Sequence, residues 1–312
     1  MKLDPTLHTK SMDVQLRTLV VNAFQLLSPL PQRSYLVIID GLDGCHDKAT
    51  QQSILQLLCE TITVHKLPLR FLIGSRSESH IRNSFGQEFL YKITRRVVLD
   101  ETFDPGRDIR VFLKDGFAKI CANNSILSHV EQPWPEEGII DLLVQRSSGQ
   151  FIYAATVLKF VGADFCSPTK QLALILKRDP TAFSDLDQLY TQILSVYPSA
   201  VNIVQVLGII IAFNENELPE VIEDILGMEE GELKLVLCGL LSLMEDENNE
   251  NWESECLNKG SYVIPHFAHA SFCDYLFDSS RSGPFHVNRQ EYESQVTLRS
   301  FVLIVQLIRP WG

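Results

Sequence analysis

The sequence predicts an α/β domain with a parallel sheet, followed by an all-helical domain and a smaller mixed module. Up to about residue 132, short apolar runs alternate with amphipathic stretches, which is typical of a parallel sheet covered by helices. Beyond that point the periodicity is helical almost throughout. These patterns divide the chain into segments 1–132, 133–198, 199–290 and 291–312, the last of which we expect to be a C-terminal helix.

Two apolar runs predict neighbouring strands of the sheet. Residues 34–40 are rich in β-branched side chains and end in an acid, and residues 69–75 form a second apolar run. The amphipathic stretch 47–65 predicts the helix between them. The apolar face expected for this helix consists of Ile54, Leu57, Leu58 and Ile62. Residues 94–99 predict a third strand.

A long series of helices is predicted after residue 103. Asp104 and Pro105 indicate a helix start, because Asp suits the N-cap and Pro suits the first turn. The expected buried face of that helix consists of Ile109, Phe112, Leu113 and Phe117. The cluster 133–135 indicates a linker, and Ser184 with Asp187 resembles a capping box. Further helices are predicted at 136–146, 150–162, 168–177, 185–197, 199–213, 217–226, 231–243 and 269–278.

The charge distribution argues against a nucleic-acid partner. Lys and Arg number 27 against 39 Asp and Glu, which gives a formal net charge of −12. Acids crowd the stretch 214–256, where Lys234 is the one base. Two helices, an acidic turn, a strand at 262–265 and a final helix have the order of a winged-helix-like domain. Its expected recognition helix, 231–243, lacks the basic stripe that DNA binding requires.

Cysteine usage and hydropathy predict a cytoplasmic protein without a membrane partner. The seven cysteines are scattered and form no C-x-x-C pair, so they are expected to be reduced thiols. The first residues lack the apolar core of a secretory signal. The most apolar stretch, 203–213, is shorter than the ~20 residues that a bilayer crossing needs.

The acids that follow the first strand are candidates for phosphate chemistry. Open α/β sheets bind ligands at the carboxyl ends of their strands. There Asp40 could hold a Mg²⁺ ion, Gly41 could allow close backbone approach, and Asp43 could orient or deprotonate an attacking water. The alternative is that Asp40 and Gly41 are present for turn formation alone.

Two further positions carry alternative interpretations. Arg76, just beyond the second strand, could sense a γ-phosphate, or it could be a surface arginine that balances Glu78. His266 and His269 lie three residues apart and superficially suggest zinc. No C-x₂₋₄-C pair accompanies them, which favours a histidine that serves a helix start. Such a polar group at a helix N-terminus could also contact an anion.

In combination, these segments resemble the NACHT class of STAND P-loop nucleotide-switch proteins, in its fungal branch with a nephrocystin-3-like N-terminal region. YLVIIDGLDGC is similar to the Walker B strand of that class, and LPLRFLIGSRSESHIR to its sensor-1 strand. SSGQFIYAATVLKFV with LDQLYTQIL is similar to its helical-domain signature, and HASFCDYLFDSSRSGPF to its winged-helix histidine motif. The resemblance runs from about residue 4 to residue 290.

The resemblance implies a role for each candidate residue. Asp40 would be the Mg²⁺ ligand, Asp43 the second acid and Arg76 the sensor. The helical segment that starts at Gly149 would cover the adenine, and His269 would touch the β-phosphate of ADP. Relatives use ATP, ADP and Mg²⁺, and exchange of ADP for ATP opens them for self-association or binding to other proteins.

The sequence departs from this class at the phosphate-binding loop. No G-x-x-x-x-G-K-[ST] motif occurs, and the strand and helix that bear it would precede Met1. Gly44 replaces the usual Glu, and the segment after Gly149 lacks a proline. We therefore expect an N-terminally truncated partial NTPase domain that alone takes no cofactor and is not an enzyme, so that the chain acts as a signalling scaffold. The alternative is an ATP/ADP switch whose Walker A segment is missing from the gene model.

The apolar stretch 296–308 leaves two interpretations open. It could contact another protein, or it could be a last helix that packs on the winged-helix-like domain.

Overall fold

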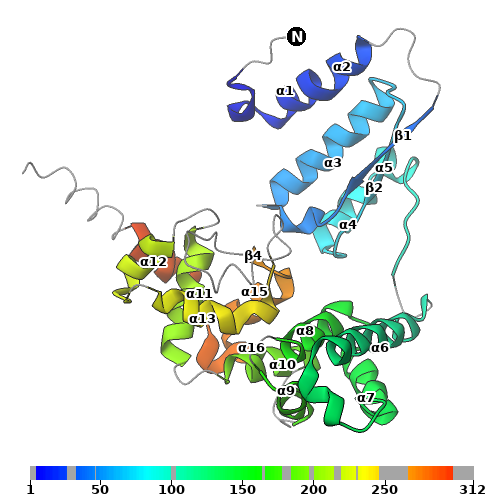
Figure 1. The fold of residues 1–312 in the computed structure, drawn as a ribbon. Helices are drawn as coiled ribbons and strands as arrows, with labels where there is room; N and C mark the ends of the chain where they lie inside the picture. The colour runs from blue at the N-terminus through cyan, green and yellow to red at the C-terminus, as the bar shows by residue number, and fades with distance from the viewer. Residues whose placement is uncertain are drawn as a thin grey trace, which may run out of the picture. The chain divides into compact units, whose positions relative to one another are not determined.

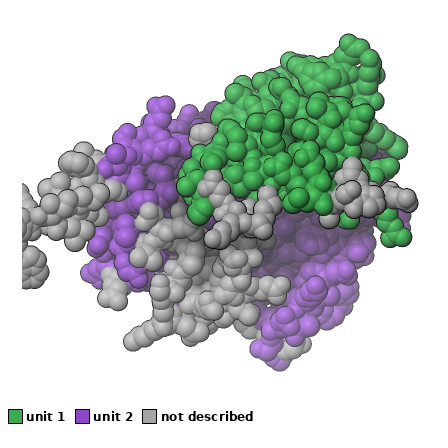
Figure 2. All heavy atoms as spheres, turned by 90° about the horizontal axis from the view of Figure 1, so that it is seen from above, with its two compact units in different colours: residues 1–98 green, residues 99–312 purple. Residues whose placement is uncertain are grey.

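The computed structural model describes residues 5–26, 33–45, 47–99, 103–163, 166–177, 184–196, 200–213, 219–229, 231–245 and 266–297. The chain forms two compact units, residues 1–98 and 99–312 (Figure 2). Each unit has buried apolar clusters of its own. The fold is mostly helical, with a small parallel sheet in the first unit.

The sheet of the first unit consists of two parallel strands. β1 (Tyr35–Ile39) and β2 (Leu69–Ile73) pair in register, with Tyr35 opposite Leu69 and Ile39 opposite Ile73. α3 (Lys48–Thr63) connects them and runs alongside the strands (Figure 1). Both strands and the connecting helix were expected from the sequence and are confirmed. A parallel pair requires such a crossover, because the second strand must start again at the same end of the sheet.

The buried face of α3 differs from the predicted one. The most buried apolar residues are Leu55 and Cys59, which are 1% and 5% exposed. The predicted face is only half-buried; it consists of Ile54, Leu57, Leu58 and Ile62. The reason is that α3 contacts α1, α4 and β2, and these neighbours bury Gln51 and Thr61 as well. Hydrophobicity alone could not locate a face that includes polar side chains.

The prediction of a third strand at 94–99 is wrong. These residues have no strand structure, and the described part of the first unit pairs only β1 with β2. Val97, Val98 and Leu99 are 60%, 53% and 85% exposed. A β-branched apolar segment forms a strand only where a neighbouring edge accepts its hydrogen bonds. This segment instead crosses the boundary between the two units after Val98.

Short helices complete the first unit. The helical stretch that starts at α1 packs through Val21 and Phe24 against the residues around the start of β2, including Leu69 and Phe71. Leu42, Leu55 and Cys59 form a second cluster with Ile81 and Leu90. The short elements are η1 (Leu7–Thr9), α1 (Met12–Leu16), η2 (Arg17–Val21), α2 (Asn22–Gln25), η3 (Leu42–Gly44), α4 (Ser79–Phe85) and α5 (Glu88–Tyr91).

The second unit is a helical assembly around one contiguous apolar core. Its elements confirm the predicted helices to within a few residues at each end. They are α6 (Pro105–Asn123), η5 (Ser125–His129), α7 (Glu137–Ser147), α8 (Phe151–Val161), α9 (Pro168–Leu176), α10 (Asp185–Leu194), α11 (Ala200–Phe213), α12 (Pro219–Leu226), α13 (Glu232–Leu240), η6 (Leu241–Leu243), β3 (Met244–Glu245), β4 (His266–Phe267), α15 (Ala270–Phe277), α16 (Ser279–Ser282) and η7 (Gly283–Phe285).

α6 begins as predicted. The Asp104 carboxylate accepts a hydrogen bond from the Arg107 amide at 3.4 Å, and Pro105 occupies the first turn. Ile109, Leu113 and Phe117 are buried in the core. Phe112 was expected there too, but it is 39% exposed and packs edge-on against Phe151 at 5.8 Å. Its position on the helix places it at the flank of the apolar stripe.

The predicted linker at 133–135 packs within the second unit. The Trp134 ring lies edge-on against Phe117, with ring centroids 5.6 Å apart. α6 packs on α7 and α8, so helices on both sides of the 133–135 cluster share one core. The segment boundaries after residues 132, 198 and 290 stay predictions.

A short antiparallel pair follows the helices α11 to α13. β3 and β4 pair with Met244 opposite Phe267 and Glu245 opposite His266. The strand predicted at 262–265 and residues 298–308 of the apolar tail lie outside the described residues, as do residues 214–218, 230 and 246–256 of the acidic run. In the part of the chain that is described, no helix is both long and apolar enough to cross a membrane.

Truncation of a core leucine should destabilise the second unit strongly. Leu237 and Leu235 both lie on α13, but Leu237 is 0% and Leu235 is 73% exposed. We expect Leu237→Ala to lower the free energy of unfolding by about 2–5 kcal/mol, because it leaves a cavity. The matched variant Leu235→Ala should change it by less than about 0.5 kcal/mol. Urea unfolding followed by circular dichroism measures both, and equal effects would contradict the assigned core.

Candidate functional site

The residues that follow β1 and β2 lie together at one edge of the sheet. The Asp43 carboxylate accepts hydrogen bonds from the Arg76 amide at 2.9 Å and from the Ser75 hydroxyl at 3.2 Å, both to Oδ1. Arg76 Nε lies 3.4 Å from Asp43 Oδ2, in an ion pair. The arrangement follows from parallel pairing, because the carboxyl ends of both strands meet at the same edge.

These contacts set the protonation state of Asp43. Partial burial acts to raise the pKa of this carboxyl. The backbone hydrogen bonds from Arg76 and Asp43, the Ser75 hydroxyl and the Arg76 charge outweigh that effect, and the pKa is lowered. A general base works best with a pKa near the working pH. The geometry therefore suits a carboxylate that orders the Ser75–Arg76 turn better than one that accepts a proton.

Asp40 lies in the turn that leaves β1. Its Oδ1 accepts a hydrogen bond from the Gly41 amide at 2.9 Å. Gly41 has a φ of +66°, which favours glycine, while no described atom lies within 4 Å of a Cβ built there. The close approach occurs at Gly74, where an added Cβ would lie 2.5 Å from Asp40 Oδ1. A side chain at position 74 would therefore collide with Asp40, so Gly74 belongs to the site, although no sequence pattern indicated it.

The acids at this edge do not form a metal site by themselves. Among the described residues, no three His, Cys, Asp or Glu side chains converge to hold a metal ion. Mg²⁺ prefers about six oxygen ligands, so Asp40 and Asp43 would need phosphate and water oxygens to complete the set. Asp40 as a Mg²⁺ ligand and Arg76 as a sensor stay predictions.

Gln51 supports this edge, although no sequence pattern indicated it. Its side chain on α3 is buried, with the residue 4% exposed. The Nε2 group donates to the carbonyl oxygens of Asp43 and Cys45, both at 3.0 Å, and Oε1 contacts His80 Nε2. Gln51 thereby ties the loop after β1 to α4. A polar residue in the first turns of an amphipathic helix is usually exposed, so no pattern identified it.

Gly149 lies in the turn between α7 and α8. It has a φ of +78°, and a Cβ added there would approach Pro105 Cγ to 3.1 Å. The helix begins at Phe151, two residues after Gly149. Gly149 thus allows the chain to reverse against the start of α6, and its role beside an adenine stays a prediction.

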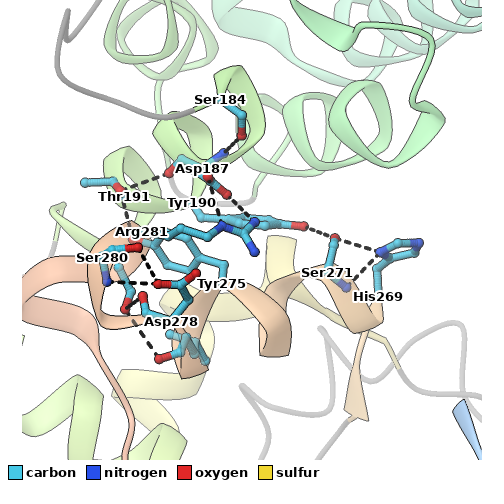
Figure 3. A network of polar contacts seen from close by, with 12 residues as sticks. Ser184, Asp187, Tyr190, Thr191, His269, Ser271, Tyr275, Asp278, Ser280 and Arg281 are labelled. Carbon is cyan, nitrogen blue, oxygen red and sulfur yellow. Dashed lines mark hydrogen bonds and ion pairs between the residues drawn. The ribbon is translucent and has the colours of Figure 1, made fainter. Parts of the chain in front are cut away.

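His269 is the N-cap of α15, as the helix-start interpretation of this histidine expected. Its Nδ1 accepts a hydrogen bond from the Ser271 amide at 3.1 Å and lies 2.7 Å from Ser271 Oγ. Ser271 Oγ is in turn 2.8 Å from the Tyr190 hydroxyl of α10 (Figure 3). The β-phosphate contact of His269 is untested. Gly149 and His269 belong to the second unit, whereas Asp40, Asp43 and Arg76 belong to the first.

Asp187 joins α10 to α16 through an ion pair in which the acid is buried and the arginine is partly exposed. Its carboxylate, 4% exposed, accepts from Arg281 Nε at 3.1 Å and from Nη2 at 2.7 Å (Figure 3). The Ser184 hydroxyl accepts from the Asp187 amide at 3.0 Å, so half of the predicted capping box is present. The Asp187 carboxylate forms the ion pair with Arg281 on α16 and does not complete the box.

Two tyrosines extend this junction. The Tyr275 hydroxyl lies 2.8 Å from Thr191 Oγ1, and the rings of Tyr190 and Tyr275 are 5.5 Å apart. Burial raises the pKa of Tyr275 to about 12 and also raises the pKa of Tyr190. Both hydroxyls are therefore neutral at physiological pH. Asp187, Tyr190 and Thr191 give α10 a row of polar contacts to α15 and α16, which we call the α10 junction.

Loss of the buried charge in the α10 junction should be costly. Asp187→Asn leaves Arg281 without its carboxylate partner, and we expect the free energy of unfolding to fall by about 3 kcal/mol. The matched variant Glu293→Gln removes one partner of the exposed Arg289–Glu293 pair and should change it by at most about 0.5 kcal/mol. Chemical denaturation compares the two variants. Similar small losses would mean that the ion pair does not hold the junction.

Asp43 should make the stability of the first unit depend on pH. Its pKa is lowered in the folded state, so its contribution is complete above the unfolded pKa of about 4 and is lost as the pH falls through the folded pKa. We expect the wild type to be more stable than Asp43→Asn at neutral pH, with the difference narrowing in acid. Denaturation at a series of pH values tests this. A difference that stays constant in acid would contradict the assigned contacts.

Comparison with known proteins gives a match over residues 2–76. This segment matches the family model described as Nephrocystin 3, N-terminal. It contains β1, α3 and β2 with Asp40, Asp43 and Arg76, and it stops before Gly149 and His269. No curated protein and no solved structure matches the chain. The match suggests that the N-terminal quarter of the chain is related to the nephrocystin-3 type.

Proposed function

We propose that this chain is a NACHT/STAND-type signalling protein that acts as an assembly scaffold without hydrolysing nucleotide. The observation that carries the proposal is the state of Asp43, whose carboxylate is already bound by the Ser75–Arg76 turn. The match of residues 2–76 to a nephrocystin-3 region supports the signalling class.

The charges at the strand ends support the absence of hydrolysis. Phosphoryl transfer relies on positioning and on neutralising the phosphate charge. Arg76 is paired with Asp43, and Asp40 adds a second negative charge at the same edge. A triphosphate at this edge would therefore meet two acids and an arginine that is already paired.

The second unit supports a scaffold role. Its helices share one core, and the α10 junction fixes α15 and α16 to α10 with paired polar groups. The order α11, α12, α13, β3, β4 and α15 is consistent with a winged-helix-like domain over 199–290. We propose that this unit binds protein partners or further copies of the chain in the cytoplasm, and that it binds no nucleic acid.

An ATP/ADP switch is the second candidate function. It is favoured by the meeting of Asp40, Asp43 and Arg76 at the carboxyl edge of a parallel sheet, where open α/β proteins bind ligands. The two candidates differ in a measurable way, because a switch must bind nucleotide through Asp40 and a scaffold need not.

Nucleotide titration of the full chain tests the proposal. Calorimetry with ADP and ATP in the presence of Mg²⁺ should give no saturable binding, and phosphate release from ATP should stay at the level of buffer. Asp40→Ala and the matched variant Asp13→Ala, an exposed acid of the same unit, should behave like the wild type. Light scattering should give the same mass with and without ATP. Micromolar affinity that Asp40→Ala abolishes and Asp13→Ala preserves would overturn the scaffold and support the switch.

A further inference from the structure

The second unit contains a cavity next to the α10 junction. It has a volume of about 630 Å³ and lies between α9 and α10 on one side and the α16–η7 turn on the other. Small-molecule sites in proteins typically have volumes of about 300–1,000 Å³. The cavity is formed by the second unit alone, so it is independent of the strand ends of the first unit.

Part of the described lining is apolar. Leu174 of α9, Val196 beyond the end of α10 and Pro284 of η7 contribute to it. Val196 is 45% exposed. These side chains provide an apolar surface for the body of a ligand.

The charged groups in the lining favour an anion. Lys177 and Arg281 line the cavity together with one acid, Asp187, while Asp274 and Asp278 interact with Arg281 from outside the lining. Arg281 donates to the Asp187 carboxylate through Nε and Nη2. Its Nη1 group has no hydrogen-bond partner among the described residues. Lys177 follows the last residue of α9 and is exposed. The lining therefore carries a net positive charge in a chain whose formal charge is −12.

We propose that this cavity binds a small organic anion with an apolar body. The phosphate or carboxylate of the ligand lies against Lys177 and Arg281 Nη1, and its apolar part contacts Leu174, Val196 and Pro284. Charge-assisted hydrogen bonds of this kind are about twice as strong as neutral ones. The proposal goes beyond the scaffold function, because it assigns the second unit a ligand of its own.

Binding has a structural consequence for the α10 junction. The lining joins two segments distant in the sequence, around Lys177 and around Arg281. A ligand that contacts both connects them directly and adds to the Asp187–Arg281 ion pair. Because only the folded state offers this site, the ligand raises the thermal stability of the protein.

Titration of the full chain with phenyl phosphate tests the proposal. This probe combines an aromatic ring with a phosphate group. We expect saturable binding by calorimetry and a higher melting temperature. Hydrogen–deuterium exchange should slow in peptides from 174–196 and 280–285. Inorganic phosphate and phenol, which each provide one half of the probe, should bind at least about tenfold more weakly.

Three variants locate the site. Lys177→Gln should weaken phenyl phosphate binding about tenfold through loss of one charge-assisted hydrogen bond. Val196→Trp places an indole at the exposed rim of the cavity and should abolish binding. Lys170→Gln, on α9 but outside the lining, should bind like the wild type. Absence of saturable binding, equal affinity for inorganic phosphate, or binding that Lys177→Gln leaves unchanged would each overturn the proposal.

Discussion

Parallel pairing of β1 with β2 is the constraint on which the candidate site depends. The register that sets Ile39 opposite Ile73 makes both strands end at the same level. As a result Gly74 lies against Asp40, and the Ser75–Arg76 turn reaches the Asp43 carboxylate. A slip of one residue would turn every side chain of a strand to the other face and would separate these groups. The geometry of the site is therefore a property of the sheet, which α3 and the buried Gln51 maintain.

The second unit is organised by a different interaction, the partly buried ion pair of the α10 junction. Asp187 and Arg281 lie far apart in the sequence, and their pairing determines how α16 meets α10. The buried tyrosines stay neutral, and their hydroxyls are hydrogen-bonded to Ser271 and Thr191. Replacement of a whole buried pair by apolar residues is often neutral for stability. We therefore assign this pair to the geometry of the junction, and with it to the shape of the adjacent cavity.

The sequence predicted the positions of helices and strands more accurately than it predicted which of their side chains are buried. The strands around Asp40 and Arg76, and the helices from Asp104 onward, follow from periodicity and capping residues, which are local signals. The wrong strand at 94–99 had strand-forming side chains but no edge to pair with. The burial of Phe112 and the buried face of α3 were predicted wrongly, because burial depends on neighbours from elsewhere in the chain. Gln51 and the Asp187–Arg281 pair left no pattern, since polar residues in amphipathic helices normally face solvent.

We propose that Arg76 serves Asp43 and does not bind a nucleotide phosphate. The nuclear magnetic resonance signal of the Arg76 Nε–H group, assigned with the variant Arg76→Lys, reports on this pairing. The account predicts that addition of ATP with Mg²⁺ leaves this signal where it is. A saturable displacement of the signal at micromolar ATP would show that Arg76 leaves Asp43 for the nucleotide, and would contradict the account.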